Sequence, residues 1–223
     1  MLLNLSLKNQ KNIGDAVCAP CQYFDLGGIH LDFNDDKPEL TENDTIIYGG
    51  GCIAVRAGLH QTKAKKILWG AGYSERGYGF NDNSGRHVNK GFALYGSRDI
   101  GCGDWVGCPS CMSPLFDIMP EPTQDFVYYG HAEFDPMELN NDCMDFEKVL
   151  RYLSKGETIV TSSYHGMYWG YLLGRRVITR PFGSKFYGLP WGISTDKGIV
   201  YKDALLEARE SNINFYEKVK KIL

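Results

Sequence analysis

The segment 158–188 constrains the fold of this chain more than any other stretch. Residues 158–161 form the β-branched run TIVT, which is typical of a strand buried on both faces of a sheet. Residues 166–173 follow without a helix breaker and carry apolar side chains at helical spacing up to Gly174. A second β-rich run, 176–180, leads into a basic loop that contains Lys185. This order predicts an open α/β sheet.

Polar residues follow the first strand of this unit. Ser162, Ser163 and His165 come where the strand ends and the helix begins. In open α/β sheets, ligands bind at the carboxyl ends of strands, where helix N-termini present unpaired N–H groups to anions. We therefore expect Ser162, Ser163, His165 and Lys185 to lie at a site for an anionic ligand.

The rest of the chain alternates between strand-like and helix-like segments. Further strands are expected at 2–7, 27–33, 45–48, 66–69, 91–95 and 125–130, and further helices at 15–24, 53–65, 142–153, 204–209 and 214–223. Residues 101–122 carry three cysteines and four prolines and are expected to cross between two halves. The predicted organisation is therefore an N-terminal half, 1–118, and a C-terminal half, 119–223.

Glycines follow two successive expected strands. Gly50 and Gly51 come after 45–48, and Gly70 and Gly72 come after 66–69. Glycine allows the backbone to approach a ligand closely, although a tight turn would explain either cluster alone. We expect these four residues to contact the substrate.

Other polar residues stand at predicted turns or strand ends. Asn12 and Asp15 precede or begin the helix 15–24, where Asp15 either contacts the ligand or caps the helix. Arg98 follows the strand 91–95, where an arginine can fix a carboxylate or phosphate by paired hydrogen bonds or form a local ion pair. We expect Arg98 and Lys185 to be exposed loop cations that bind an anionic donor.

Two Cys-x-x-Cys pairs, Cys18 with Cys21 and Cys108 with Cys111, have the local spacing of a four-thiolate zinc site. Pro20 lies inside the first pair, and the pairs are far apart without knuckle glycines. Buried thiols are the favoured interpretation, so we expect no metal. An odd number of cysteines, seven, also fits reduced thiols better than a disulfide framework.

Charge and hydropathy exclude several classes of protein. The net charge of −3 does not indicate a sequence-independent nucleic-acid binder or a polybasic membrane anchor. The first ten residues do not resemble a secretory signal, and no apolar window of 18 residues occurs. We therefore expect a cytoplasmic protein that binds neither nucleic acid nor membrane.

Taken together, these motifs resemble the polysaccharide pyruvyl transferases over nearly the whole chain. The resemblance rests on NIGD at 12–15, GGG at 49–51, WGAG at 69–72, Arg98, and TSSYHG at 161–166 followed by Lys185. It implies two Rossmann-like halves facing across a cleft, as in GT-B glycosyltransferases, here reduced in size. It also implies transfer of pyruvyl from phosphoenolpyruvate, without a cofactor, to sugar hydroxyls of a surface glycan or a lipid-linked precursor.

The chemistry of that reaction can be matched to individual residues. A proton must reach the methylene carbon of the donor, and the phosphate leaving group must be neutralised. His165 is suited to the acid role, and His131 is the reserve acid or base. Arg98, Arg180 and Lys185 are the cations available to hold carboxylate and phosphate.

Two departures from the family keep other functions open. Many members have arginine where this chain has Ser163, and 223 residues is short for the family. A non-catalytic glycan-binding relative is one alternative. A GT-B glycosyltransferase is the other; its nucleotide sugar would have to be held by Asp196 and the aromatic loop 186–191. The oligomeric state stays open.

Overall fold

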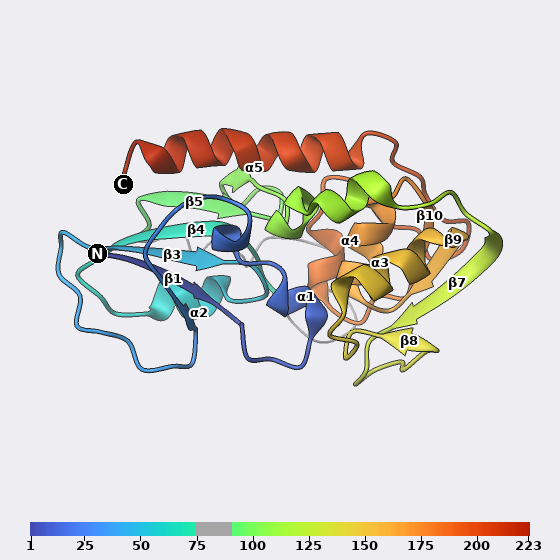
Figure 1. The fold of residues 1–223 in the computed structure, drawn as a ribbon, viewed down its shortest axis with the longest axis horizontal. Helices are drawn as coiled ribbons and strands as arrows, with labels where there is room; N and C mark the ends of the chain where they lie inside the picture. Colours follow the sequence, from blue (N-terminus) through green and yellow to red (C-terminus); the bar gives the residue numbers. More distant parts are fainter. Residues whose placement is uncertain (75–90) are drawn as a thin grey trace.

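The computed structural model describes residues 1–74 and 91–223, which form two parallel β-sheets along the long axis of the molecule (Figure 1). The first sheet has the order β2-β1-β3-β4-β5-β6, and the second has the order β10-β9-β7-β8. The strands of the first sheet are β1 (Leu2–Ser6), β2 (Ile29–Asp32), β3 (Thr45–Gly49), β4 (Lys65–Ala71), β5 (Leu94–Ser97) and β6 (Asp104–Trp105). Those of the second are β7 (Gln124–Gly130), β8 (Leu139–Asn140), β9 (Gly156–Thr161) and β10 (Arg176–Thr179). The predicted α/β class is confirmed.

The β-branched run that opened the sequence analysis lies in β9. Its residues pair in parallel register with β10 on one side and β7 on the other, for example Ile159 with Val177 and Val127. Ile159 is fully buried. A strand with neighbours on both edges and both faces covered favours β-branched side chains, and its buried Thr161 hydroxyl donates to the Tyr129 carbonyl at 2.7 Å, which explains the continuous TIVT run.

Helices connect the strands and cover the sheets. They are α1 (Ile13–Ala16), α2 (Ala54–Leu59), α3 (Phe146–Ser154), α4 (Tyr164–Leu172) and α5 (Ala204–Lys220), with short 3₁₀ turns at η1 (Pro20–Gln22), η2 (Pro109–Met112), η3 (Pro114–Ile118) and η4 (Ser184–Tyr187). Each residue of α4 is buried. Helix α4 therefore forms the centre of the second half, rather than a surface layer.

Two predicted helices are shorter in the structure. The expected helix 15–24 consists of α1 and the 3₁₀ turn η1, because Pro20 cannot donate a backbone hydrogen bond. The expected helix 53–65 ends at Leu59. There the Nζ of Lys66 donates to the carbonyls of Ala57 and Gly58, at 3.2 and 3.1 Å, and so satisfies the end of the helix.

The end of the chain forms one helix, α5, where the sequence indicated two helical pieces. Asn212, in the polar stretch between the expected pieces, is fully buried and accepts a hydrogen bond from Trp69 Nε1 at 2.9 Å. Its Nδ2 donates to the Gly107 carbonyl at 3.0 Å. The polar residue that interrupts the apolar pattern, Asn212, thus makes hydrogen bonds inside the protein, and the helix continues past it.

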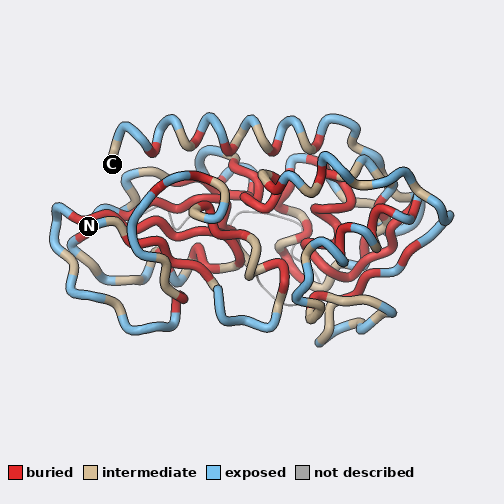
Figure 2. The backbone as a smooth tube through the Cα atoms, in the orientation of Figure 1, coloured by how far each residue is buried: buried red, intermediate tan, exposed pale blue. Residues whose placement is uncertain are grey.

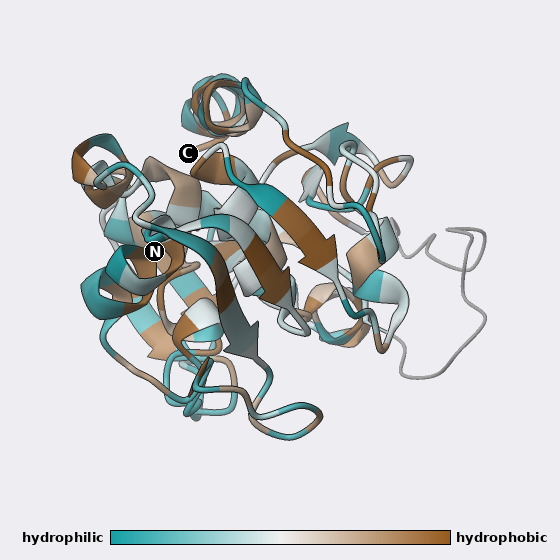
Figure 3. Ribbon diagram, turned by 90° about the vertical axis from the view of Figure 1, so that its right-hand side faces the viewer, coloured by the Kyte–Doolittle hydropathy of each residue, from teal (hydrophilic) through white to brown (hydrophobic). Residues whose placement is uncertain are grey.

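Helix α5 also crosses the predicted boundary between the halves. The first sheet precedes residue 118 and the second follows it, yet α5 packs back on the first sheet through Phe215 and Val219. Its outer side is exposed in Figure 2, and the end-on view in Figure 3 shows both hydrophilic and hydrophobic residues around it. The C-terminal segment therefore belongs to the cores of both halves.

Within the described ranges, 1–74 and 91–223, none of the helices has the length and apolar character required to cross a lipid bilayer.

Candidate functional site

The order of strands predicts where each sheet binds a ligand. In the first sheet, β1 lies between β2 and β3, and in the second, β7 lies between β8 and β9. At such positions the connections leave on opposite sides of the sheet and open a crevice at the carboxyl ends of the strands. The residues that follow β1, β3, β7 and β9 are therefore the first to consider.

Two adjoining cavities lie at these strand ends. The outer cavity has a volume of about 390 Å³ and the inner one of about 70 Å³, and both are lined by Asn12, Asp15, Cys52 and Lys185. The inner cavity is also lined by Leu7, Arg98, Tyr164 and His165. The outer cavity is bordered in addition by His131, Glu133, Phe134 and Phe182. The structure thus brings together Asn12, Asp15, Arg98, His165 and Lys185 from the two halves.

His165 lies in the first turn of α4, directly after Tyr164, and is almost completely buried. Its ring lies between Tyr164 and Trp169, with centroid distances of 5.2 and 5.1 Å. A side chain at Gly14 would overlap its Nδ1, so glycine is required for the ring to pack against α1. The histidine is therefore held by both halves of the chain at the wall of the inner cavity.

Arg98 is 1% exposed, so the expectation of an exposed loop cation is wrong for this residue. Its guanidinium carbon lies 4.0 Å from the centre of the Tyr164 ring, and its Nη2 donates to Cys52 Sγ at 2.9 Å. Although burial opposes the charge, Cys52, Tyr164 and Asp99 raise the pKa of Arg98 further above its usual value. A permanent positive charge therefore lies beside the inner cavity.

Lys185 and Asp15 lie where the two cavities adjoin. The Nζ of Lys185 lies 4.7 Å from the centre of the Phe182 ring, and its side chain is partly exposed. Burial raises the pKa of the Asp15 carboxyl above its usual value, and the charges of His165, Arg98 and Lys185 counteract part of that rise. Asp15 is thus a carboxylate whose affinity for a proton is increased by its surroundings.

Asn12 has a local role in placing Asp15. Its Oδ1 accepts a hydrogen bond from the Gly14 N–H at 3.1 Å and caps α1. The next residue, Ile13, donates its N–H to the carbonyl of Asn141 in the other half at 2.9 Å. The turn that carries Asp15 is therefore attached to both halves.

Gly50 and Gly51, after β3, pack against residues of α1 and the segment that follows it. Their φ angles are +64° and +68°, in the region that favours glycine. A side chain at Gly50 would overlap Cys18, and one at Gly51 would meet Asp15 Oδ1 at 3.0 Å. These glycines allow Asp15 and Cys18 to approach the end of β3, and their contact with substrate stays a prediction.

Gly70 and Gly72 have a similar structural role. A side chain at Gly70 would meet Pro109 Cδ at 2.5 Å, and one at Gly72 would meet Arg98 Nε at 2.5 Å. The absence of a side chain at Gly72 leaves room for the buried guanidinium of Arg98. A direct substrate contact by either residue stays a prediction.

The two serines after β9 are engaged in the backbone of the second half. Ser163 caps α4 by accepting from the Gly166 N–H at 3.3 Å, and Ser162 accepts from the His131 N–H at 3.0 Å. Both serines are buried. Their hydroxyls hold the strand ends in place, and a substrate contact by either stays a prediction.

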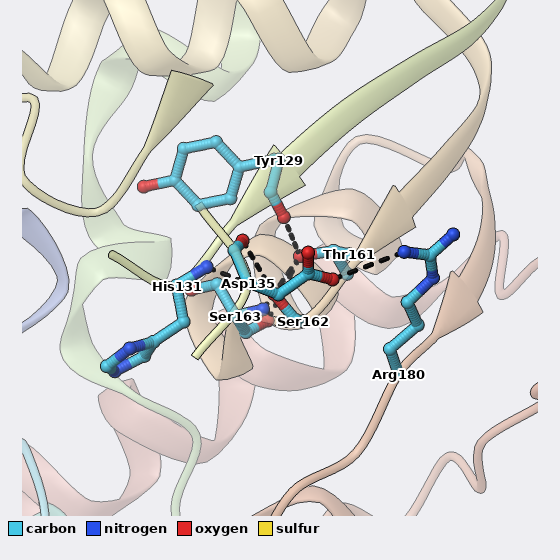
Figure 4. Close-up of polar contacts among 7 residues, drawn as sticks. All are labelled: Tyr129, His131, Asp135, Thr161, Ser162, Ser163 and Arg180. Carbon is cyan, nitrogen blue, oxygen red and sulfur yellow. Dashed lines mark hydrogen bonds and ion pairs between the residues drawn. The ribbon is translucent and has the colours of Figure 1, made fainter. Parts of the chain in front are cut away.

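Arg180 and His131 lie on opposite sides of this serine pair (Figure 4). Arg180 Nη1 contacts Asp135 Oδ2 at 3.2 Å and lines a separate hollow with Ser162. The His131 ring points away from Arg180 and packs against Phe182, with centroids 5.1 Å apart, at the outer cavity. Of the two, His131 thus belongs with the main cavities.

A pair of cysteines lies behind His165. Cys108 Sγ is 3.7 Å from His165 Nε2 and 3.2 Å from Ser110 Oγ, while the neighbouring Cys18 thiol donates to the Asp15 carbonyl at 3.0 Å. Burial opposes ionisation of Cys108, but the hydrogen bonds from Cys18 and His165 hold its pKa well below its usual value, while the same contact and burial raise the pKa of Cys18.

The two Cys-x-x-Cys motifs do not combine into one four-sulfur group. Cys111 contacts Asn212 Nδ2 at 3.4 Å, and Cys21 is partly exposed. Among the residues that the structure describes, no cluster of three or more His, Cys, Asp or Glu side chains is placed to hold a metal ion.

Sequence reasoning missed several residues of the site. Cys52 and Tyr164 line the inner cavity, and Cys108 contacts His165. Cys52 directly follows the glycines, and Tyr164 directly precedes His165. These positions are the signals from which both residues could have been found. The contact of Cys108 could not be found from spacing, because 57 residues separate it from His165.

The residues named for a nucleotide site have other roles. Phe186 and Trp191 are buried in the core, and Trp191 stacks on Tyr168 with centroids 6.0 Å apart. Asp196 accepts from the Lys197 N–H and from Ser194 in an exposed turn. The aromatic loop is therefore used for packing.

Comparisons with known proteins yield one likeness in structure. No protein-family model and no curated protein matches the chain. The crystal structure of a functionally uncharacterized protein from Klebsiella pneumoniae subsp. pneumoniae NTUH-K2044 has a TM-score of 0.51 and 16% identity, over 80% of this chain and 82% of that chain. At this identity the likeness concerns the fold alone, and it is compatible with a Rossmann-like architecture.

Proposed function

We propose that this protein transfers a pyruvyl group from phosphoenolpyruvate to sugar hydroxyls of a surface glycan or its precursor. The observation that carries this proposal is the convergence of a buried arginine, a lysine, a histidine and a carboxylate on two adjoining cavities. Such a set suits a small dianionic or trianionic donor that must be protonated on carbon. The proposal extends to a GT-B-like arrangement, with donor and acceptor meeting between the halves.

The donor anion is assigned to the inner cavity. A space of about 70 Å³ suits a phosphate or carboxylate group rather than a whole sugar. Arg98 supplies a permanent charge there, and Lys185 can reach the same anion from the junction of the cavities. This chain has Ser163 where many family members carry arginine, so Arg98, which lies on the Tyr164 ring, is the buried cation assigned to the donor.

The acceptor sugar is assigned to the outer cavity. Its volume of about 390 Å³ accommodates a sugar ring, and Phe134 and Phe182 provide an aromatic border. Asp15 lines both cavities, so an acceptor hydroxyl next to the donor would face its carboxylate. The raised pKa of Asp15 suits a group that accepts a proton from that hydroxyl.

In the proposed reaction, His165 gives its proton to the methylene carbon of the donor, which becomes a methyl group. A first sugar hydroxyl adds to the central carbon and releases its proton to Asp15. The carbon–oxygen bond to phosphate then breaks, and a second hydroxyl adds to give the cyclic ketal. One hydroxyl proton replaces the proton used by His165, and the other leaves with phosphate as HPO₄²⁻.

Ligand-dependent thermal shifts provide the first test. Phosphoenolpyruvate should raise the melting temperature of the wild type and of Lys221→Ala, an exposed-cation control, but not that of Lys185→Ala. With methyl glycosides as acceptors, phosphate release and a new ketal methyl signal in the proton NMR spectrum should follow. A shift with nucleotide sugars and none with phosphoenolpyruvate would contradict the proposal and support the glycosyltransferase.

A further inference from the structure

A third hollow, here called the side hollow, adjoins the outer cavity and has no role in the proposed reaction. It has a volume of about 270 Å³ and is lined by Phe134, Asp135, Ser162, Arg180, Pro181 and Phe182. Phe134 and Phe182 line the outer cavity as well, so these two rings form a wall that both spaces share. A ligand longer than one sugar ring can therefore extend from the outer cavity past this wall.

The shared wall is a stacked pair of aromatic rings. The ring centroids of Phe134 and Phe182 lie 4.1 Å apart with an interplanar angle of 22°, and the His131 ring packs against both, at 4.9 and 5.1 Å. Phe134 is nevertheless 42% exposed. The face of an aromatic ring carries partial negative charge and attracts the polarised C–H groups on one face of a pyranose. The wall therefore has the chemistry of a sugar-stacking platform.

The polar groups of the side hollow include an ion pair. Arg180 Nη1 lies 3.2 Å from Asp135 Oδ2, and both side chains are partly exposed (Figure 4). The guanidinium has further N–H donors and the carboxylate further acceptor positions, and neighbouring sugar hydroxyls can use both because each donates and accepts. The two charges also neutralise each other, so an anionic sugar would be repelled by Asp135 and a cationic one by Arg180. The pair therefore favours a neutral sugar.

The backbone around the side hollow is held by internal hydrogen bonds. The N–H groups of Phe134 and Asp135 donate to the His131 carbonyl at 3.1 and 2.9 Å and close a tight turn. The N–H of Arg180 donates to the Thr161 carbonyl at 2.7 Å. A sugar bound there requires little additional ordering of the backbone, which favours affinity.

We propose that the side hollow binds a second, neutral sugar residue of the acceptor, next to the sugar in the outer cavity that receives the pyruvyl group. Phe134 and Phe182 stack on the glycan, and Arg180 and Asp135 bind its hydroxyls. The acceptor class is thereby an oligosaccharide of at least two residues. This inference rests on the proposed function for the role of the outer cavity, whereas binding of sugar in the side hollow requires no reaction.

Direct binding of glycans is the first measurement. A panel of neutral disaccharides is compared with the methyl glycosides of their component sugars by saturation-transfer NMR, and dissociation constants follow from titration calorimetry. At least one disaccharide should bind about tenfold or more tightly than its methyl glycosides, as expected for a few added hydrogen bonds and a stacking contact. The absence of such a gain throughout the panel would overturn the inference, and so would a gain confined to carboxylated disaccharides.

Variants then assign the gain to the side hollow. Arg180→Ala and Asp135→Ala should lose most of it with little change in melting temperature, because an exposed ion pair contributes little to stability. Lys220→Ala removes an exposed cation paired with Glu217, and Phe126→Ala removes an aromatic ring that is 51% exposed; both controls should keep the gain. Arg180→Lys and Asp135→Asn serve if either alanine variant unfolds. A gain that persists in folded variants of both residues would overturn the inference.

Turnover separates this inference from the proposed function. With phosphoenolpyruvate as donor, the disaccharide should have a lower KM than its methyl glycosides, and Arg180→Ala should remove most of that difference. Binding of phosphoenolpyruvate without any disaccharide gain would reject the side hollow and leave the proposed reaction. A disaccharide gain that Arg180→Ala removes, in a protein inactive with phosphoenolpyruvate, would uphold the sugar site and reject the reaction alone.

Discussion

The guanidinium carbon of Arg98 lies 4.0 Å from the centre of the Tyr164 ring. Arg98 follows β5 of the first sheet, and Tyr164 begins α4 of the second half. The contact therefore joins the two halves at the inner cavity and places a charge beside His165. Arg98 is therefore internal to the fold and, in the proposed reaction, also binds the donor.

Arg98→Ala should weaken both functions. Removal of the buried guanidinium and its contact with the Tyr164 ring leaves a cavity that the surrounding side chains fill only in part. We therefore expect the free energy of unfolding to fall by about 2 kcal/mol or more. Binding of phosphoenolpyruvate should be lost as well. Denaturant unfolding and isothermal titration calorimetry measure the two effects separately; a variant that is as stable as the wild type would contradict the internal role.

Lys185→Ala should affect donor binding more than stability. The lysine is partly exposed, and its contact with Phe182 contributes less than about 1 kcal/mol at such a site. The dissociation constant for phosphoenolpyruvate should rise by at least about tenfold, as for loss of one charge-assisted contact. Lys185→Arg should recover part of the affinity, and unfolding of Lys185→Ala would instead make the residue structural.

His165→Gln should keep the fold and the donor affinity while losing on the order of 10²- to 10⁴-fold in rate, the usual span for general acid catalysis. A rate that depends on a general acid should fall as the pH rises, whereas deprotonation of an acceptor by a glycosyltransferase base would give a rising rate. In deuterated water the new methyl group should contain deuterium. A ketal methyl without deuterium would reject carbon protonation.

Gly14→Ala should disable the site through His165. The added methyl group would overlap Nδ1, so the ring or α1 must move. We expect a loss of activity comparable to that of His165→Gln. Gly192→Ala is the matched control, because its methyl group would lie 3.6 Å from the Tyr201 hydroxyl, an ordinary contact. Equal activity of the two variants would contradict this packing.

Asp15→Asn should stabilise the protein while impairing catalysis. Burial raises the pKa of Asp15 in the folded chain above its value in the unfolded chain. Between these two pKa values, the folded state therefore binds more protons than the unfolded state. The contribution of Asp15 to stability therefore falls as the pH rises through this range. At neutral pH the buried carboxylate is charged and destabilises the folded state. Asn should raise Tm there by on the order of 2–4 °C, the effect of about 1 kcal/mol at this size.

The same comparison at acid pH is the control for this effect. Below the unfolded carboxyl value, Asp15 is protonated in both states, so the difference in Tm between Asp15→Asn and the wild type should vanish. A difference that persists unchanged at acid pH would assign the stabilisation to packing and not to charge.

The sequence determined the strands and the residues that follow them. Continuous β-branched runs such as 158–161 are typical of strands between two covered faces. The strand predicted to end at Thr161 ends there, and those predicted to end at 48, 69 and 95 end one or two residues later, at Gly49, Ala71 and Ser97. That local pattern was enough to bring Asp15, Arg98, His165 and Lys185 into one proposed site, since the carboxyl ends of parallel strands share an edge.

The tertiary structure decided what depends on contacts between distant residues. Arg98 is buried because Gly72 and Tyr164 enclose it, and α5 is continuous because Asn212 finds Trp69. Burial and pairing across the chain depend on strand order and helix docking, which local propensity does not encode. For the same reason the sulfur of Cys108 reaches His165 only in the folded molecule, where two residues of the first half, Cys108 and Gly14, lie against Nε2 and Nδ1 of a histidine in the second.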